Sequence, residues 1–374
     1  MPWLDTNLQN PQLRPLAQRF VSELRLGDDH TDAVEMLLAN LQQAGQEPLL
    51  FRRAADAYSP SRYQRFDRHH ILSPLWRMRG KHIGESKASA GHAPTAQALP
   101  LLQGKLARIE ATAVFAEPII LRSEKLWNEK RAARVASGID YDDTDETNRM
   151  REELRRYNDV LVRHRVVDAT GQRHSTHLAR IFSQGSFAKG GRFYRASYQQ
   201  LSKPDRAKLT IDGDHVVELD FASMHPTMLC LRAGLEPPED AYAKDGFERG
   251  VLKLAFNVAL NASTSASACR AVARSLRESG HAEPERTARR YVEAMPSLYP
   301  EFEAQLFTGV GLDLQRLDSD IAALVMAACI DAGIPVLVMH DSFLVGRSHE
   351  VELRRMMTEA FQAVLGTTHP PKIK

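Results

Sequence analysis

Two apolar runs in the C-terminal half of the chain each carry an aspartate where a buried strand is expected. Val216-Val217-Glu218-Leu219 leads directly into Asp220, and the nearly continuous apolar run from Pro335 to Val345 is interrupted only at His340-Asp341-Ser342. An acidic side chain on a buried strand is unfavourable unless it is paired or binds a cation. Mg²⁺ prefers oxygen ligands and commonly uses one or two protein carboxylates together with substrate phosphates. The pair Asp220 and Asp341 therefore predicts a divalent metal site, whereas either aspartate alone would be interpreted as a strand-end cap.

Longer helical patterns separate and follow these strand-like runs. Apolar residues recur at the spacing of one helix face around Arg249–Asn261, Ile321–Ile330 and Val351–Leu365. A capped amphipathic helix is also expected after Asp142–Glu146, because negative charge stabilises a helix N-terminus. Helices packed on a small sheet of short strands define an α/β or α+β sandwich.

The segment Arg249–Asn261 carries a narrow polar stripe on an otherwise apolar helix. Arg249, Lys253, Asn257 and Asn261 are spaced four apart and so lie on one face. Two cations one turn apart suit an anionic ligand such as a nucleoside triphosphate, with the two amides further along the same groove. A solvated helix face would show a similar pattern, but this stripe has no charge after Lys253. We interpret it as facing a ligand.

The overall charge conceals a strong local concentration of bases. The chain has 374 residues, with 49 Lys and Arg against 47 Asp and Glu, and this near balance by itself argues against a nucleic-acid binder. The bases nevertheless concentrate in three segments, Arg52–Lys81, Arg149–Arg156 and Arg192–Lys208. In the first segment they alternate with aromatic residues, which suits phosphate contacts combined with base stacking, although a solvated surface is equally compatible. The small net charge therefore does not exclude binding to a polyanion.

Several other classes of protein are disfavoured by the sequence. No apolar run approaches the ~20 residues of a membrane span, and the start of the chain lacks a signal-peptide pattern, so a cytoplasmic location is expected. Three isolated cysteines support neither a disulfide framework nor a cysteine-based zinc site. The histidines His69-His70 and His174/His177 have no cysteine or carboxylate at ligand spacing, and we interpret them as surface or nucleic-acid-facing residues.

Five short motifs occur in one order between Lys189 and the end of the chain. They are Gly191-Arg192-Phe193-Tyr194, Asp220-Phe221-Ala222-Ser223-Met224-His225, Arg249-x₃-Lys253, Gln315 five residues before Asp320, and Val338-Met339-His340-Asp341-Ser342-Phe343. These motifs and their order resemble those of the family A DNA polymerases and the related single-subunit RNA polymerases. The chain is similar to a compact member, such as occurs in mobile elements and phages. The resemblance covers about residues 185–374, roughly half of the chain.

This resemblance implies a fold and a division of the chain. The expected fold class is α+β, with a polymerase-like palm (a small antiparallel sheet with helices) and reduced helical fingers over residues 185–374. Residues 1–90 are expected to form a basic, mainly helical region, and residues 91–184 a helical thumb-like or template-clamp region. The small and polar residues of Glu85–Gln97 resemble a linker near the boundary between these two regions.

The resemblance also implies a role for each matching residue. The ligands of two Mg²⁺ ions (with Mn²⁺ as an alternative), about 3.5–4 Å apart, would be Asp220, the Phe221 carbonyl and Asp341. The nucleotide would be contacted by Arg249, Lys253, His225, Asn257 and Asn261. The primer–template end would be held by Arg192, Tyr194, Gln315 and His340. Asp220, Asp341 and Lys253 would be the catalytic residues, with Lys253 protonating the leaving pyrophosphate.

Template-directed DNA synthesis is therefore the expected function, as in DNA replication. Its partners would be nucleoside triphosphates and a DNA primer–template or single-stranded nucleic acid, and the sequence indicates no protein partner. Two departures from the family pattern leave the choice between dNTP and rNTP open: His225 replaces a glutamate near the sugar, and Asn261-Ala262 replaces Tyr-Gly. The alternatives are an RNA polymerase or primase of the single-subunit type, an untemplated nucleotidyltransferase, or an inactive palm that binds nucleic acid.

Overall fold

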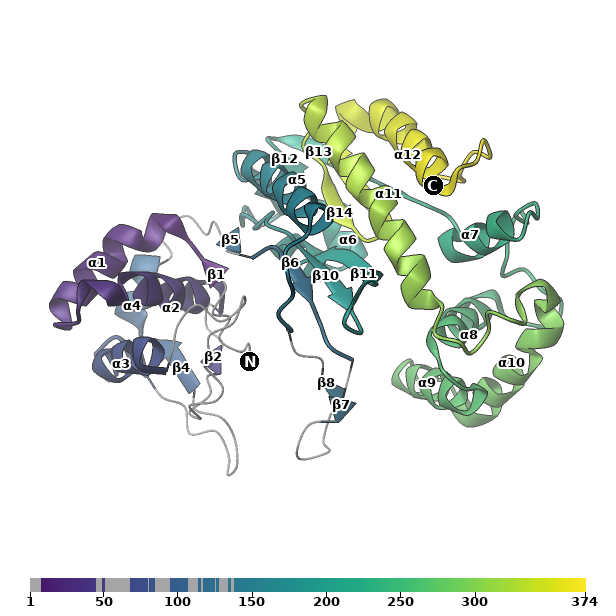
Figure 1. Cartoon of the computed structure of the whole chain (residues 1–374), viewed down its shortest axis with the longest axis horizontal. Helices are drawn as coiled ribbons and strands as arrows, with labels where there is room; N and C mark the ends of the chain where they lie inside the picture. The colour runs from purple at the N-terminus through teal and green to yellow at the C-terminus, as the bar shows by residue number, and fades with distance from the viewer. Residues whose placement is uncertain are drawn as a thin grey trace. The chain divides into compact units, whose positions relative to one another are not determined.

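The computed structural model describes residues 8–44, 49–50, 68–79, 81–84, 95–106, 114–115, 117–124, 126–127, 134–135 and 138–374. The chain divides into two compact units, whose helices and strands are labelled in Figure 1. The first comprises Met1–Arg180 and Tyr194–Gly213, and the second comprises Ile181–Phe193 and Asp214–Lys374. Helices and small antiparallel sheets occur together, which confirms the predicted α+β class. The division into regions 1–90, 91–184 and 185–374 remains a prediction.

The first unit contains helices and short strands. Its helices are α1 (Arg14–Glu23), α2 (Thr31–Ala44), α3 (Arg68–Met78), α4 (Pro100–Leu106), α5 (Asp145–Leu161) and α6 (Lys203–Arg206). Its strands include the antiparallel pairs β1 (Leu8–Gln9) with β5 (Val114–Phe115), β7 (Leu126–Trp127) with β8 (Arg134–Val135), and β9 (Val166–Val167) with β12 (Thr210–Ile211). It also holds the sheet of β2 (Leu49–Leu50), β4 (Thr95–Ala98) and β3 (Ile83–Gly84), and the strand β6 (Ile119–Leu121). None of the helices in the described part of the chain has the length and apolarity of a membrane span.

Helix α5 shows how local sequence produces one of these elements. Thr144 is its N-cap, and the side chains of Thr144 and Thr147 each bond the other residue's backbone N–H, which forms a capping box. Met150 and Leu154 lie on its buried face. The capped amphipathic helix predicted after the acidic segment is therefore confirmed.

Three predictions for this unit turn out differently or lie outside the described residues. His174 and His177 are both buried, so their assignment to a surface is wrong. The Nε2 atom of His174 lies 3.1 Å from an Asp168 carboxylate oxygen, and burial lowers the pKa of His177 to about 4. Most of the basic segment Arg52–Lys81 lies outside the described residues, as does most of the linker-like segment, whose last residues instead begin β4.

The second unit is built on a three-stranded antiparallel arrangement. Its strands are β13 (Asp214–Asp220), β15 (Ser342–Gly346) and β14 (Leu337–Met339), with β15 between the other two. Every residue of β15 is buried. The expectation of a single buried strand from Pro335 to Val345 is wrong, because Met339 pairs with Ser342 and leaves His340-Asp341 as a two-residue hairpin turn. His340 has a φ of 62°, a conformation that such tight hairpins require.

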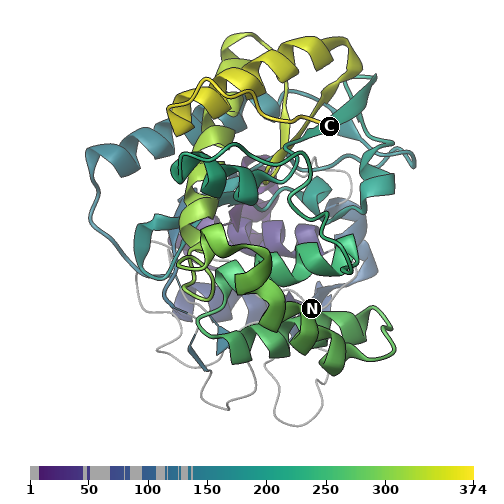
Figure 2. The ribbon, with the colours of Figure 1, turned by 90° about the vertical axis from the view of Figure 1, so that its right-hand side faces the viewer.

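The helices of this unit include two groups that pack together. The helices are α7 (Met224–Arg232), α8 (Arg249–Asn261), α9 (Ser265–Glu278), α10 (Pro284–Leu298), α11 (Gly311–Asp331) and α12 (Glu350–Leu365). Helices α8, α9 and α10 pack against one another, and α11 packs against α12 (Figures 1 and 2). The three-helix group α8–α10 falls where the sequence predicts reduced helical fingers. Its core includes Phe256, whose ring centroid lies 4.6 Å from the ring centroid of Tyr299.

Two glycines allow β11 to approach α11 closely. Strand β11 (Ser186–Tyr194) neighbours β10 (Ala179–Ser183), and it contains Gly190 and Gly191 with φ values of 77° and 82°. A Cβ atom on Gly191 would lie 2.8 Å from the Phe182 ring and 2.9 Å from the Ser319 hydroxyl on α11. Only glycine combines this backbone conformation with this spacing. The close approach places the next residue, Arg192, against α11.

We expect Gly191→Ala to lower the free energy of unfolding by about 2–5 kcal/mol. The left-handed conformation costs a residue with a Cβ about 1–2 kcal/mol, and overpacking typically adds about 1–3 kcal/mol. Gly234→Ala is the matched control, because Gly234 has a φ of 68° but no atom within 4 Å of its added Cβ. Urea denaturation of both variants measures the difference. Equal losses would show that β11 does not depend on this close approach.

Candidate active site

A polar pocket of about 410 Å³ opens in the second unit, where β13 ends near the β14–β15 turn. It collects ten of the twelve residues singled out in the sequence: Arg192, Asp220, Phe221, His225, Arg249, Lys253, Asn257, Asn261, Gln315 and Asp341. These residues come from β11, β13, α7, α8, α11 and the hairpin turn. Segments that are far apart in the sequence therefore contribute to one pocket.

The two aspartates lie at neighbouring strand ends. Asp220 is the last residue of β13 and pairs with Ser342, the residue that follows Asp341. The backbone N–H of Phe221 donates to the Asp341 carbonyl at 3.3 Å. The Phe221 side chain is buried against Phe343 and Phe361, with ring centroids 6.2 Å and 5.8 Å away. This apolar anchor fixes the backbone on which both carboxylates are carried.

A third segment completes the support of Asp220. The backbone N–H groups of Asp220 and Lys374 each donate to the other residue's carbonyl at 3.0 Å, and the N–H of Ala222 donates to the Lys372 carbonyl at 2.8 Å. Lys374 also lines the pocket. Sequence reasoning missed Lys374, because no local pattern connects it with a strand far earlier in the chain. The segment Asp220–Ala222 is thus held by the hairpin turn and by residues 372–374.

A buried carboxylate joins two of the predicted site residues. The Asp318 side chain, on α11, is 0% exposed. The Nε of Arg192 donates to its two oxygens at 3.0 and 3.1 Å, and the Arg192 Nη2 also donates to Oδ2. The Nε2 of His225 lies 3.1 Å from the same Oδ2. Such a two-point contact between guanidinium and carboxylate sets the position of both groups.

Asp318 was not among the predicted site residues, although its position in the helical pattern indicates that it is buried. It follows Leu314 by four residues and precedes Ala322 by four, so it lies on the buried face of α11. An acid on an apolar helix face requires a partner for the same reason as the acids on the strands. A lone acid on the buried face of α11 therefore predicts a cationic partner, which is Arg192.

The polar stripe of α8 faces the pocket along its whole length, since all four of its residues line it. Arg249 pairs with Asp240, with Nε and Oδ2 2.6 Å apart, and this hydrogen bond raises the pKa of Arg249. Its guanidinium also lies 5.8 Å from the centroid of the Tyr242 ring. The Asn261 amide donates to the Asn257 carbonyl at 2.8 Å. The Lys253 ammonium makes no hydrogen bond or ion pair with any other residue that the structure describes.

Two predicted contact residues do not line the pocket. Tyr194, at the end of β11, belongs to the first unit. His340 lies in the hairpin turn beside Asp341, and its side chain is not part of the pocket wall. The geometry therefore does not bring these two side chains together with the other ten.

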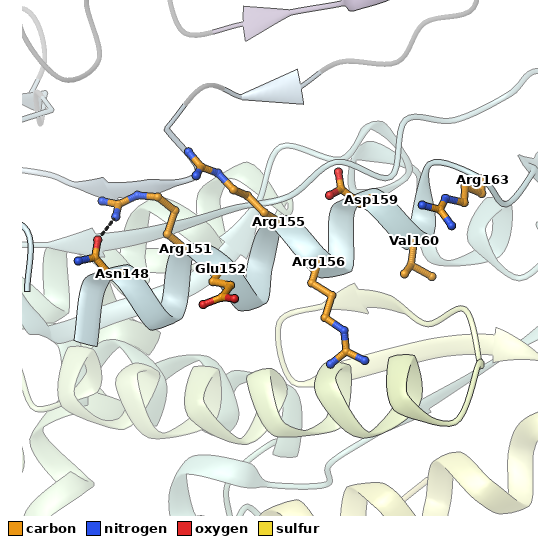
Figure 3. A pocket seen from close by; sticks show the side chains of 8 residues that line it. All are labelled: Asn148, Arg151, Glu152, Arg155, Arg156, Asp159, Val160 and Arg163. Carbon is orange, nitrogen blue, oxygen red and sulfur yellow. Dashed lines mark hydrogen bonds between the residues drawn. The ribbon is translucent and has the colours of Figure 1, made fainter. Parts of the chain in front are cut away.

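A second pocket, of about 620 Å³, runs along α5 in the first unit (Figure 3). It carries four arginines, but Arg151 is buried and bonded to Glu117 with Nε–O distances of 3.1 Å. The remaining arginines are accompanied by the acids Glu152 and Asp159. The sequence suggested that this flank faces a polyanion. The structure gives Arg151 a packing role and leaves a surface of mixed charge.

The fold and the pocket define an α+β protein with a two-carboxylate, cation-lined site. No protein-family model and no curated protein matches the chain. Among solved structures, it is similar to the POL domain of Pol1 from M. smegmatis in complex with DNA primer-template and dNTP, at 13% identity and a TM-score of 0.28. The match covers 99% of this chain and 66% of that one, so the chain spans just under two thirds of its length. A likeness this distant decides nothing about activity, which has to be argued from the pocket.

Proposed function

We propose that this chain is a metal-dependent nucleotidyltransferase and that template-directed DNA synthesis is its reaction. The observation that carries the proposal is the presence, in one pocket, of two strand-end carboxylates and the α8 cations Arg249 and Lys253. Carboxylates that hold a divalent cation and bases that bind phosphates are the two parts that phosphoryl transfer requires.

The residues of the pocket fit Mg²⁺. Asp220 and Asp341 offer hard oxygen ligands, which this ion prefers. Among the described residues, no group donates a hydrogen bond to the Asp341 carboxylate, so that carboxylate has capacity for a cation. Asp220 and Asp341, together with the Phe221 carbonyl, would hold the metal. When bound, Mg²⁺ would act as a Lewis acid towards phosphate oxygens.

The other pocket residues would bind and orient the substrates. Lys253 would place a point charge on the triphosphate, with Arg249 one turn away, and Lys253 is the proton donor available to the leaving group. Asn257 and Asn261 would offer amides further along α8. His225, fixed through Nε2 by Asp318, would border the sugar.

The primer–template end would be positioned by residues from two other elements that line the pocket. Arg192 and Gln315 line the pocket and come from β11 and α11. Asp318 engages the Nε and Nη2 atoms of Arg192, which orients the guanidinium and offsets part of its charge. Arg192 would therefore contact nucleic acid as an oriented, partly neutralised group.

A single-subunit-type RNA polymerase or primase is the second candidate. His225 occupies the place where a glutamate crowds the sugar 2′ position in the family A DNA polymerases, and it lines the pocket here. At this place the chain therefore has an imidazole held by Asp318 instead of a glutamate carboxylate. Primer extension with each class of nucleotide distinguishes the use of deoxyribonucleotides from that of ribonucleotides.

Primer extension with labelled dNTPs or rNTPs, with and without a template, tests the proposal in Mg²⁺ and in Mn²⁺. Templated DNA synthesis predicts incorporation of dNTPs that depends on the template. Incorporation of rNTPs alone would select the RNA polymerase or primase, and extension without a template an untemplated transferase. A protein that shifts labelled nucleic acid in a gel but incorporates nothing would be a binding module, and the proposed activity would be wrong.

We expect Lys253→Ala to reduce kcat/KM for the incoming nucleotide by about 10²–10³-fold, the loss typical of removing one group that stabilises developing charge. Arg270→Ala, at an exposed position on the neighbouring helix α9, is the control and should leave kcat/KM unchanged. Steady-state incorporation at varied nucleotide concentration measures both. If the two variants behave alike, the α8 stripe does not bind the triphosphate.

A further inference from the structure

Three metal-ligating side chains from distant parts of the sequence meet in the first unit. Asp29 and His30 belong to the 3₁₀ turn η2 (Asp28–His30), which leads into α2, and His70 lies in the first turn of α3. One ligand atom from each residue lies within 4.8 Å of the others. The Asp29 oxygens are 3.1 Å from the Nδ1 of His30 and 3.3 Å from the Nε2 of His70.

The two nitrogen–oxygen separations are close to the edges of a small coordination polyhedron, and all three ligand atoms lie within 4.8 Å of one another. With metal–ligand bonds of ~2.0–2.2 Å, neighbouring ligand atoms of a tetrahedral site lie about 3.3–3.6 Å apart. The two imidazole rings have centroids 4.9 Å apart and an angle of 35° between their planes. Each ring has one nitrogen atom against an Asp29 oxygen. A cation between the three side chains would draw these ligand atoms into one coordination shell.

The burial of the three residues suits a site with one fixed ligand and access from solvent. The His30 side chain is 6% exposed, whereas those of His70 and Asp29 are 28% and 67% exposed. The backbone at Gly27 leaves room for the carboxylate, because a Cβ there would lie 2.5 Å from the Asp29 Oδ1. Glycine at this position keeps the Asp29 side chain turned towards His30.

We propose that Asp29, His30 and His70 bind one divalent transition-metal ion, of which Zn²⁺ is the best fit. Two imidazoles and one carboxylate are borderline-soft ligands that suit Zn²⁺, whereas Mg²⁺ prefers oxygen ligands alone. The ion would connect the start of α2 with the start of α3 and stabilise their packing. The site does not depend on the proposed nucleotidyl transfer, since its residues belong to the first unit and the carboxylate pocket to the second.

His70 was expected to lie at a surface or to face nucleic acid, because no metal-ligand spacing was recognised around it in the sequence. Asp29 supplies a carboxylate from 41 residues away. Ligand spacing along the chain therefore could not indicate this site.

Titration of the full-length protein with Co²⁺, in an excess of Mg²⁺ that occupies the carboxylate pocket, tests the proposal. We expect one equivalent of Co²⁺ to bind and to give the intense visible absorption of a low-coordinate nitrogen and oxygen site, and Zn²⁺ to displace it. His70→Ala and Asp29→Ala should each weaken Co²⁺ binding at least about tenfold, since even groups that only orient a metal ligand are worth 10–100-fold in affinity. Gly27→Ala should weaken it as well.

The control is His281→Ala, which removes an exposed histidine of the second unit and should leave Co²⁺ binding unchanged. Circular dichroism establishes that each variant is folded, and the exposed position of Asp29 makes Asp29→Ala the safest of them. If wild-type protein gives no such absorption, or if folded Asp29→Ala and His70→Ala bind Co²⁺ as tightly as wild type, the three residues form hydrogen bonds only and the proposal is wrong. Primer extension has no part in this readout.

Discussion

Asp341→Asn is expected to reduce kcat/KM for nucleotide incorporation by at least about 10³-fold. The substitution keeps the size of the side chain and the hairpin turn but removes the negative charge that would hold Mg²⁺. Stabilisation of charge by a metal ion is worth several kcal/mol, and each ~1.4 kcal/mol corresponds to a factor of ten in rate. Primer extension under the conditions that give maximal wild-type activity is the measurement.

The matched control for this substitution is Asp331→Asn, at an exposed position near the end of α11. It should retain the wild-type rate. The thermal unfolding midpoint of Asp341→Asn should also stay close to that of wild type, because the carboxylate makes no hydrogen bond with the described residues. If Asp341→Asn extends a primer as fast as wild type, the proposed function is wrong.

Asp318→Ala is expected to lower the free energy of unfolding by about 3–5 kcal/mol, the usual cost of removing one partner from a buried ion pair. Asp318 is fully buried, and its loss leaves Arg192, only 17% exposed, without its carboxylate. His225 loses its contact to the same oxygen. The substitution should therefore affect the pocket as well as stability, and urea denaturation and primer extension measure the two effects.

Asp320→Asn, two residues further along α11, is the control for Asp318→Ala. Asp320 pairs with Arg316 at 2.8 Å, but both side chains are partly exposed, so the expected loss is below about 1 kcal/mol. The milder Asp318→Asn should remain folded and change the ratio of dNTP to rNTP incorporation, because His225 would no longer be held in one position. Unchanged selectivity in a folded Asp318→Asn protein would show that Asp318 supports the fold without positioning His225.

The elements that were predicted well are those with a strong local signal. Helix α8 has the predicted bounds Arg249–Asn261, and α12 begins one residue before the predicted Val351. Both have a clear apolar face of helical period. Helix α11 was expected only from Ile321, because its first ten residues include many polar side chains, of which Gln315 lines the pocket, and lack a clean apolar pattern.

The prediction of one strand from Pro335 to Val345 was wrong, and it also came from a local apolar pattern. An apolar run interrupted by a short polar segment describes one long strand and two hairpin-paired strands equally well. The structure forms a hairpin, and Asp341 therefore lies in a turn beside the end of β13. The prediction that Asp220 and Asp341 belong to one site did not depend on this distinction.

The sequence by itself determined the α+β class, the polar stripe of α8 and the two acids on apolar strands. These features depend on interactions between residues close together in the chain, whose period and spacing can be read directly. Only the tertiary structure decided that Asp318 lies between Arg192 and His225, that Lys374 supports Asp220, and that Asp29 and His30 meet His70. Each of these contacts joins segments far apart in the sequence, and the packing of separate elements places them together.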